Sequence, residues 1–311
     1  MDDRRRPARL VSRPGGQAMN AIIALLRPQQ WLKNGFVLIG LIFSHGWTNS
    51  ALVFGVAVGF VAFCLASSAV YVLNDYHDRA ADAAHPKKRY RPIASGRVGL
   101  PTARALIVVL AGGALGLPLA SGLWPVALAV AAYLLLNIAY TLRLKHKVLV
   151  DVFCIAAGFM LRLACGTYAV GILPSRWMLL CSFMLTLFLG FAKRRAEIVA
   201  IPEGALALQG STRVVLRHYS PQLLDNLVAI TASASLLTYG LYTVDAETAA
   251  LHGTEHLVLT LPIVTFGVFR YLHLLYKGGS GEEPGRDLLA DNQIRIAVLA
   301  WVAVVVLLVG T

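Results

Sequence analysis

Four polar residues with regular spacing could do chemistry at the end of an apolar segment. Asn74, Asp75, Asp78 and Asp82 form the pattern N-D-x-x-D-x-x-x-D, directly after an apolar run over 51–73. If a helix continues through the pattern, the three aspartates stand at i, i+3 and i+7, within about 60° of one another. Carboxylates gathered on one face repel one another unless a cation lies among them. Hard oxygen ligands suit Mg²⁺, so the pattern predicts a metal site at Asp75, Asp78 and Asp82, with a solvated helix end as the alternative.

A basic segment follows the acidic pattern at once. The stretch HPKKRYRPIASG holds four cations within five positions: Lys87, Lys88, Arg89 and Arg91. In a metal–diphosphate site the metal bridges two phosphate oxygens, and Lys and Arg take up the remaining charge. We therefore expect Lys87, Arg89 and Arg91, together with Asn74, to bind a phosphorylated substrate. The alternative is an ordinary basic loop at the cytoplasmic membrane surface.

Arg162 is a charged residue inside an apolar segment. It lies about 14 residues into the expected span 148–170, roughly 21 Å of helix from its start. A centred arginine costs about 2.5–3.5 kcal/mol on insertion scales, so it normally faces a polar cavity. Gly158 and Gly166, one turn before and after it, would let a neighbour or a substrate approach. Phosphate binding in a central cavity and a buried ion pair with Asp151 both explain this arginine.

Composition identifies the environment that holds these residues. Of the 311 residues 57% are hydrophobic and 14% are charged, with a mean hydropathy of +0.66. A soluble domain carries roughly 25% charged residues, so a water-soluble protein is excluded. The net charge of +12 lies between long apolar runs. It therefore indicates membrane orientation and attraction to anionic lipid head groups, not nucleic acid binding.

Nine segments are long enough to cross a bilayer, which takes about 20 apolar residues. They are 22–45, 51–73, 102–120, 124–141, 148–170, 176–195, 222–243, 256–276 and 292–310. All but two of the 28 Lys and Arg residues then fall on one side or at its rim, and that side is cytoplasmic by the positive-inside rule. The sequence predicts an all-α, multi-pass integral membrane protein, with a cytoplasmic N-terminus, an outer C-terminus and a disordered basic tail over 1–20.

The sequence resembles the UbiA superfamily of intramembrane prenyltransferases. The resemblance rests on the N-D-x-x-D-x-x-x-D motif, the HPKKRYRPIASG stretch and the nine spans, and it covers nearly the whole chain after residue 20. LLRPQQWLKN, YTLRLK, GFMLRLACG and KRRAE are similar to the branch of decaprenyl-phosphate phosphoribosyltransferases. The resemblance implies one UbiA-like domain over 21–311 in the inner (plasma) membrane. Its helices would surround a central cavity that opens to the cytoplasmic side.

One segment departs from the pattern of many superfamily members. Members with aromatic acceptors carry a second aspartate-rich motif after the sixth span. The corresponding place here reads LGFAKRRAEI, in which Glu197 is the only carboxylate among Lys193, Arg194 and Arg195. That composition suits phosphate oxygens better than a second metal, so Lys193, Arg194 and Glu197 are expected at the substrate. A surface ion pair between Lys193 and Glu197 is the alternative.

Four further residues join the predicted site through the resemblance. Lys33 and Asn34 interrupt the first apolar segment, which the family places against the active cavity, so a phosphate contact is expected. Snorkelling of Lys33 to the interface is the alternative. Tyr140 and Lys145 complete the predicted substrate-binding set, although both residue types also mark membrane interfaces.

The resemblance implies a Mg²⁺-dependent glycosyltransferase. Such an enzyme moves the 5-phosphoribosyl group from 5-phosphoribosyl 1-diphosphate to decaprenyl (polyprenyl) phosphate. It releases diphosphate and forms decaprenylphosphoryl-5-phosphoribose, a precursor of cell-wall arabinan. Mg²⁺ on the aspartates would stabilise the leaving diphosphate. Membrane lipids are expected partners, and an oligomer of identical subunits is compatible with the sequence.

Two other functions fit parts of the pattern. A UbiA-type prenyltransferase would use the aspartates to bind prenyl diphosphate and would pass the prenyl group to an aromatic or lipid acceptor. A transporter or lipid-binding scaffold would share the membrane fold. Transporters bind their substrates near the midplane, whereas the densest charge here lies at the cytoplasmic rim, which favours an enzyme.

Overall fold

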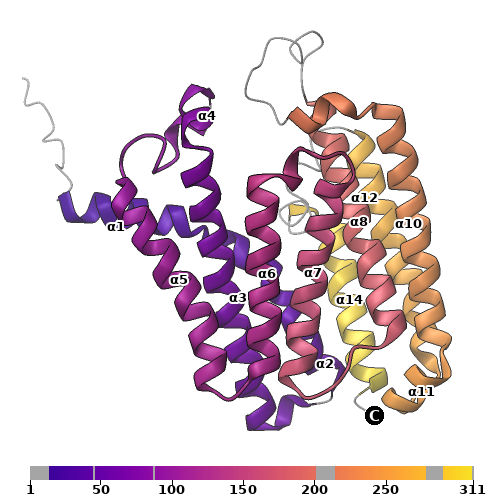
Figure 1. Ribbon diagram of the computed structural model, residues 1–311. Coiled ribbons are helices and arrows are strands. Elements are labelled where there is room, and N and C mark those ends of the chain that lie inside the picture. The colour runs from indigo at the N-terminus through magenta and orange to yellow at the C-terminus, as the bar shows by residue number, and fades with distance from the viewer. Residues whose placement is uncertain (1–13, 45, 87, 201–213, 278–289, 310–311) are drawn as a thin grey trace, which may run out of the picture.

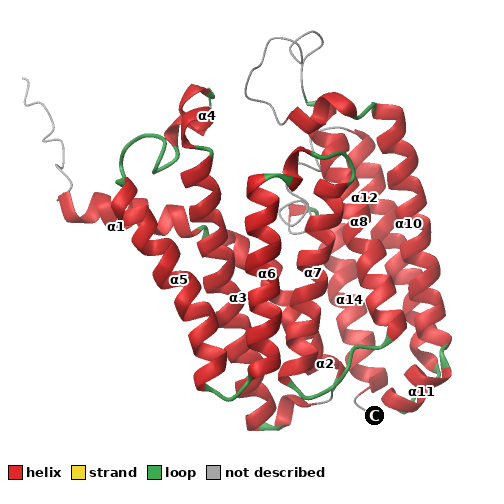
Figure 2. Cartoon of the chain, in the orientation of Figure 1, coloured by secondary structure: helices red, strands yellow, loops and turns green. Residues whose placement is uncertain are grey.

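The fold is helical throughout the part of the chain that the structure describes. The computed structural model describes residues 14–44, 46–86, 88–200, 214–277 and 290–309. Eight stretches of helix in it are long and apolar enough to cross a membrane. In chain order they are α3 (Ser50–His77), α5 (Leu100–Ala120), α6 (Trp124–Leu142), α7 (Val150–Ala169), α8 (Arg176–Val199), α10 (Pro221–Val244), η6 with α12 (His256–Thr260 and Leu261–Lys277) and α14 (Asn292–Val309). The predicted all-α membrane architecture is confirmed (Figure 2).

The long helices form one bundle in which consecutive members run in alternating directions (Figure 1). Helix α3 packs against α5 and α6, α7 packs against α6 and α8, and α8 packs against α10. The short helix α4 (Arg79–Ala84), which carries part of the acidic pattern, lies at one end of the bundle. The last helix, α14, ends at the opposite end. We call the end that carries α4 the acidic-motif end.

The first predicted span is not one continuous helix. In place of a helix over 22–45, the chain forms α1 (Pro14–Leu26), the 3₁₀ helix η1 (Pro28–Leu38) and α2 (Ile39–Phe43). Arg27 separates the first two with a left-handed backbone (φ 52°), because a residue before proline is disfavoured in the helical region. At about 2.0 Å per residue in η1 and 1.5 Å in α2, this segment is about 30 Å long, enough to cross the hydrocarbon core. Residues 1–13 of the predicted tail lie outside the described residues, and α1 begins at Pro14.

Helix α7 lies at the centre of the bundle because it contributes to two apolar cores. One core joins α7 to α8, α10 and α12 and includes Phe188 and Leu224. The other joins α7 to η1, α3 and α6 and includes Val37 and Phe63. Any residue of α7 that lies between the two cores is therefore held by packing from both sides.

Backbones of α7 and the first segment meet at glycines. A Cβ atom built on Gly166 would lie 2.0 Å from the carbonyl oxygen of Val37, and one built on Gly40 would lie 2.3 Å from the Gly166 carbonyl group. Only residues without a side chain permit this approach. The expectation that Gly166 lets a neighbour approach is confirmed, and the neighbour is η1 with α2.

Gly166→Ala is expected to lower the free energy of unfolding by about 1–3 kcal/mol, the usual cost of overpacking. The added methyl group meets backbone atoms, which cannot rotate away as a side chain can. Thermal unfolding of the detergent-solubilised protein measures the effect. Gly112→Ala in α5 is the matched control, because a Cβ there has no neighbour within 4 Å, and alanine is the better helix former by about 0.5–1 kcal/mol. Equal melting temperatures for both variants would contradict the prediction.

Candidate active site

The acidic pattern spans a break between two helices. Helix α3 continues past the apolar run to His77, so Asn74 and Asp75 are helical, and α4 carries Asp82. Asp78 lies at the break between them. The predicted single helix face is therefore only partly formed. Asp75 is 2% exposed and Asp82 is 4% exposed, so two of the three carboxylates are removed from water.

Two of these carboxylates converge on one cation. The Nη1 atom of Arg91 lies 3.0 Å from Oδ1 of Asp75 and 2.7 Å from Oδ2 of Asp82. The Nη2 atom of Arg27 lies 2.8 and 3.0 Å from the two carboxylate oxygens of Asp75. The same guanidinium lies over the ring of Tyr71, 5.1 Å from its centroid. Arg91 was predicted to bind substrate, and the structure brings it to the acidic residues.

Arg27 lies at the acidic cluster although its sequence position did not predict a site residue. It lies at the break between α1 and η1, and its left-handed backbone turns its side chain towards Asp75. The Arg-Pro pair at 27–28 was a visible signal, because it marks a forced break in an apolar segment. Nothing in the local sequence connects that break to an aspartate 48 residues later.

The third aspartate turns to a different cation. Lys145 donates from Nζ to both oxygens of Asp78, at 2.6 and 2.9 Å, and Nδ1 of His77 lies 2.9 Å from Oδ1. Burial alone would raise the pKa of Asp78, but the hydrogen bonds from His77 and Lys145 outweigh it and hold that pKa below the ordinary value. Lys145, predicted to bind substrate, thus lies at the acidic cluster. The loop that carries it connects α6 to α7.

The donor set suits a hard divalent cation at two of the three aspartates. Among the described residues no three His, Cys, Asp or Glu side chains gather closely enough to hold a metal ion. Asp75 and Asp82 nevertheless accept from the same Arg91 nitrogen, so their oxygens already face a shared position for positive charge. Mg²⁺ needs only one or two carboxylates when substrate phosphates complete its shell. The pair therefore fits Mg²⁺, whereas Asp78 points to Lys145.

A cavity of about 570 Å³ adjoins the acidic cluster. Tyr71, one helical turn before Asp75, lines the cavity, which connects the two regions. Most of its wall is apolar, and four cations face it from separate elements. They are Lys33 of η1, Arg162 of α7, Lys193 of α8 and Arg295 of α14. None of the described residues that line it is acidic, so an anion with an apolar part matches this space.

Arg162 is buried at 6% exposure and has neutral partners. It donates from Nε to Oδ1 of Asn34 (2.8 Å), from Nη1 to the Gly158 carbonyl (3.0 Å) and from Nη2 to the Tyr133 hydroxyl (3.0 Å). The alternative of an ion pair with Asp151 is wrong, because Asp151 binds another arginine. Asn34 is fully buried behind Arg162 and is not among the residues that line the cavity. Asn34, predicted to contact phosphate, thus accepts a hydrogen bond from Arg162 and does not face the cavity.

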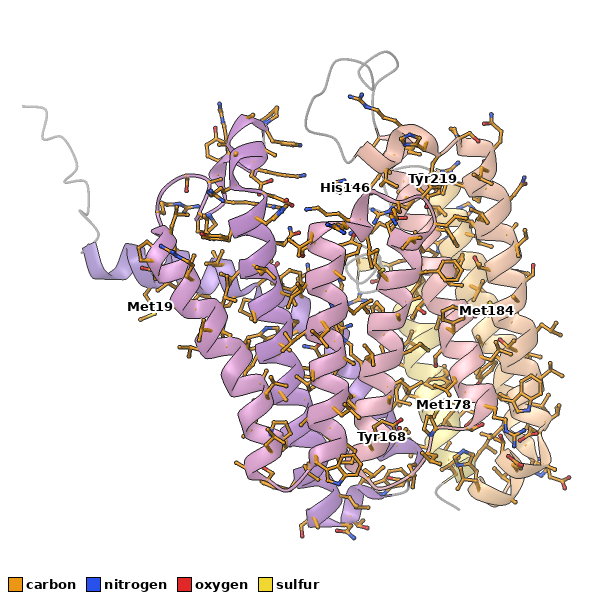
Figure 3. The ribbon with its side chains drawn as sticks, viewed as in Figure 1. Met19, His146, Tyr168, Met178, Met184 and Tyr219 are labelled. Atoms are coloured by element: carbon orange, nitrogen blue, oxygen red, sulfur yellow. The ribbon has the colours of Figure 1, made fainter. Side chains whose placement is uncertain are left out.

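Arg194 belongs to a buried network and does not line the cavity. Its side chain is 0% exposed, and it donates from Nε to Asp151 (2.7 Å) and from Nη1 to Glu197 (2.5 Å). The Tyr219 hydroxyl donates to Asp151 (3.0 Å) and accepts from the backbone N–H of Leu149 (2.7 Å). Burial raises the pKa of Tyr219, so this hydroxyl keeps its proton. Tyr219 and His146 lie at the acidic-motif end of the bundle in Figure 3.

The adjacent residues Lys193 and Arg194 thus have different surroundings. Neighbouring residues on a helix point about 100° apart, so Lys193 lines the cavity while Arg194 faces the core between α7 and α8. The network of Leu149, Tyr219, Asp151 and Arg194 fixes the start of α7 and the end of the loop that carries Lys145. Arg194 and Glu197 therefore support the site from outside the cavity.

The remaining predicted residues have less direct positions. Lys87 lies outside the described residues. Arg89 is exposed and donates to the Tyr90 hydroxyl at 2.6 Å. Asn74 and Tyr140 are half-buried and do not line the cavity. Tyr71, Tyr133 and Arg295 line the cavity although they were not predicted.

Comparison with known proteins agrees with this architecture. The model of the UbiA prenyltransferase family matches residues 35–283. A decaprenyl-phosphate phosphoribosyltransferase of Corynebacterium glutamicum is 31% identical over 299 residues, which are 95% of this chain and 89% of that protein. One from Mycolicibacterium smegmatis is 31% identical over 309 residues, 94% of this chain and 93% of that protein.

A solved structure shares the fold. The structure of a UbiA homolog from Archaeoglobus fulgidus bound to GPP and Mg²⁺ superimposes with a TM-score of 0.69. The alignment covers 94% of this chain and 100% of that one at 16% sequence identity. At that identity the solved structure supports only the arrangement of helices. The similarity in sequence is to the two relatives at 31% identity.

Proposed function

The chain belongs to the UbiA prenyltransferase family, and from that premise we propose that it is a decaprenyl-phosphate phosphoribosyltransferase. It moves the 5-phosphoribosyl group from 5-phosphoribosyl 1-diphosphate to decaprenyl (polyprenyl) phosphate. The product, decaprenylphosphoryl-5-phosphoribose, would serve as a precursor of cell-wall arabinan. The observation that carries the proposal is an apolar cavity with four cations and no acid, next to two converging carboxylates. The names of the two relatives point the same way.

The reaction joins two anions, so positive charge is needed on both. An oxygen of the lipid phosphate attacks C1 of the ribosyl group. The bond from C1 to the diphosphate oxygen breaks, and diphosphate leaves with the electron pair. The attacking oxygen is already ionised, so no general base is needed. Cavities lined by one sign of charge also raise the local concentration of the opposite one.

Each member of the acidic cluster then has a task. Asp75 and Asp82 would hold Mg²⁺, which supplies positive charge to the leaving diphosphate. Arg27 and Arg91 stand within hydrogen-bonding distance of these two carboxylates, and Lys145 pairs with Asp78 beside them. All three cations would donate charge-assisted hydrogen bonds to the same anion. The cavity next to the acidic cluster would bind the polyprenyl chain of the lipid acceptor.

Location and organisation are part of the proposal. The basic loops of the acidic-motif end favour a cytoplasmic position for that end in the inner (plasma) membrane. The N-terminus would then be cytoplasmic, the C-terminus outside, and the active site would face the cytoplasm. Residues 21–311 would form a single domain, preceded by the basic tail.

The proposed reaction is tested by offering purified protein two pairs of substrates. Labelled 5-phosphoribosyl diphosphate with polyprenyl phosphate should give a labelled lipid, and prenyl diphosphate with hydroxybenzoate should give no product. Excess EDTA should lower the rate at least about 100-fold, since metal charge on a leaving group is worth several kcal/mol, and added Mg²⁺ should restore it. Product from the second pair alone would reassign the chain to prenyl transfer. Full activity in EDTA would remove the metal from the mechanism.

A further inference from the structure

We propose that Arg162 binds the phosphate monoester of the lipid acceptor inside the cavity, with Asn34 and Tyr133 as positioning residues. The inference rests on the proposed function, because it assigns one of the two substrates to a subsite separate from the acidic cluster. The evidence is that Arg162 is buried without a carboxylate partner among the described residues and that it lines the cavity.

The charge of Arg162 has no carboxylate partner among the described residues. The residue is 6% exposed, and its three hydrogen bonds go to an amide oxygen, a carbonyl oxygen and a hydroxyl. Asp151, the acid nearest to it along the same helix, is taken by Arg194 and Tyr219. A buried charge normally has an opposite charge beside it. We therefore expect an anionic ligand to bind beside the Arg162 guanidinium.

The guanidinium keeps donors for such a ligand. It has five N–H groups, and the three bonds use one on each nitrogen. One N–H on Nη1 and one on Nη2 therefore lack an acceptor among the described residues. Two donors on the terminal nitrogens are the fork with which arginine binds phosphate in a bidentate way.

The guanidinium is also held in place before any ligand binds. The rings of Tyr133, Phe159 and Phe63 lie 4.7, 5.2 and 5.6 Å from its central carbon. Asn34, which orients Nε, itself donates towards Cys64 and Ser67 on α3. A cation fixed by packing loses little conformational freedom on binding, which favours affinity.

The position of Arg162 favours the lipid phosphate over the sugar phosphate. Its Cα lies about 18 Å of helix from the start of α7, and its side chain points back towards that end, where Nη1 meets Gly158. The same cavity is lined by apolar residues of η1, α8 and α14, such as Leu32, Leu189 and Leu299. A polyprenyl chain would pack against these apolar residues. A ribose would bury its hydroxyl groups there without hydrogen-bond partners.

Arg162→Met tests the assignment. The apparent affinity for polyprenyl phosphate should fall about 10- to 100-fold, since charge-assisted hydrogen bonds are lost, while the KM for 5-phosphoribosyl diphosphate stays within about threefold. Because no acid loses its partner, the melting temperature should fall only by the loss of the hydrogen bonds to Asn34, Gly158 and Tyr133. Arg195→Met is the matched control: Arg195 pairs with Asp225 outside the cavity, and its loss should leave both KM values unchanged.

Thermal-shift measurements with non-reacting ligands test whether Arg162 binds the lipid phosphate or the sugar phosphate. Farnesyl phosphate should raise the melting temperature of the wild-type protein, and Arg162→Met should remove the phosphate-dependent part of that shift. Farnesol, which lacks the phosphate, should act equally on both proteins. A variant that instead loses a shift caused by ribose 5-phosphate, or whose KM rises only for the sugar diphosphate, would overturn the assignment to the lipid.

Two further outcomes keep the test decisive. If Arg162→Met does not fold, Arg162→Lys keeps the charge but not the fork. It should then weaken farnesyl phosphate binding in a folded protein, and unchanged binding would refute the subsite. If wild-type protein binds farnesyl phosphate through Arg162 but transfers no phosphoribosyl group, the proposed function fails and the anion subsite stands.

Discussion

Asp75→Asn is expected to lower turnover by about 10²–10³-fold while the protein remains folded. The substitution removes one of the two converging carboxylates, and with it the charge that would hold Mg²⁺ beside the leaving diphosphate. Metal charge on a departing group is worth several kcal/mol, at about 1.4 kcal/mol per factor of ten. The arginines that pair with Asp75 are 29% and 26% exposed, so water can solvate them after the change. Single-turnover rates at saturating Mg²⁺ measure the loss.

Asp225→Asn is the matched control for this prediction. It makes the same change on α10, where the carboxylate pairs with Arg195 at the surface. Its turnover should remain within about twofold of the wild type. If Asp75→Asn kept full activity, the acidic cluster would not be the metal site. A carrier, by contrast, would keep its flux in this variant, so the same pair of proteins separates enzyme from transporter.

Asp151→Asn is expected to lower the free energy of unfolding by about 3 kcal/mol, the lower end of the cost of breaking a buried ion pair, because Arg194 keeps Glu197 as its second partner. Arg194 is fully buried and binds Asp151 across α7 and α8 at 2.7 Å. Arg194 and Tyr219 donate to different oxygens of Asp151, and the amide keeps only one acceptor oxygen, so the variant loses one hydrogen bond together with the charge. Thermal or denaturant unfolding in detergent measures it.

A double variant distinguishes charge from packing at this site. Asp151→Asn combined with Arg194→Met removes both charges of the buried pair and should be more stable than Asp151→Asn alone. Glu197, which then loses Arg194, is 21% exposed and can be solvated. Equal stability of the two variants would show that the ion pair is not the source of the effect. Asp225→Asn again serves as control, with an expected change of about 1 kcal/mol or less for a surface pair.

Several features were predictable from sequence because each is written in a contiguous stretch. Long apolar runs identified the membrane class, and the orientation inferred from the bias of Lys and Arg stays a prediction. The N-D-x-x-D-x-x-x-D pattern indicated where carboxylates gather. KRRAE at 193–197, where other superfamily members carry a second aspartate-rich motif, indicated cations in that part of the site. Segment composition also identified Arg162 as a charge that needs a cavity. These inferences depend on hydrophobicity and helix period, which are local properties.

The pairing of charges was decided only by the tertiary structure. Arg27 binds Asp75 across 48 residues, and Lys145 binds Asp78 across 67. Arg194, which was expected at the substrate, forms the buried ion pair with Asp151 that was the alternative for Arg162. Arg162 has neutral partners and lines the cavity. Helix period gives the face of each residue on its own helix. It does not give the rotation and depth at which helices from distant segments meet, and that packing determines which charge lies beside which.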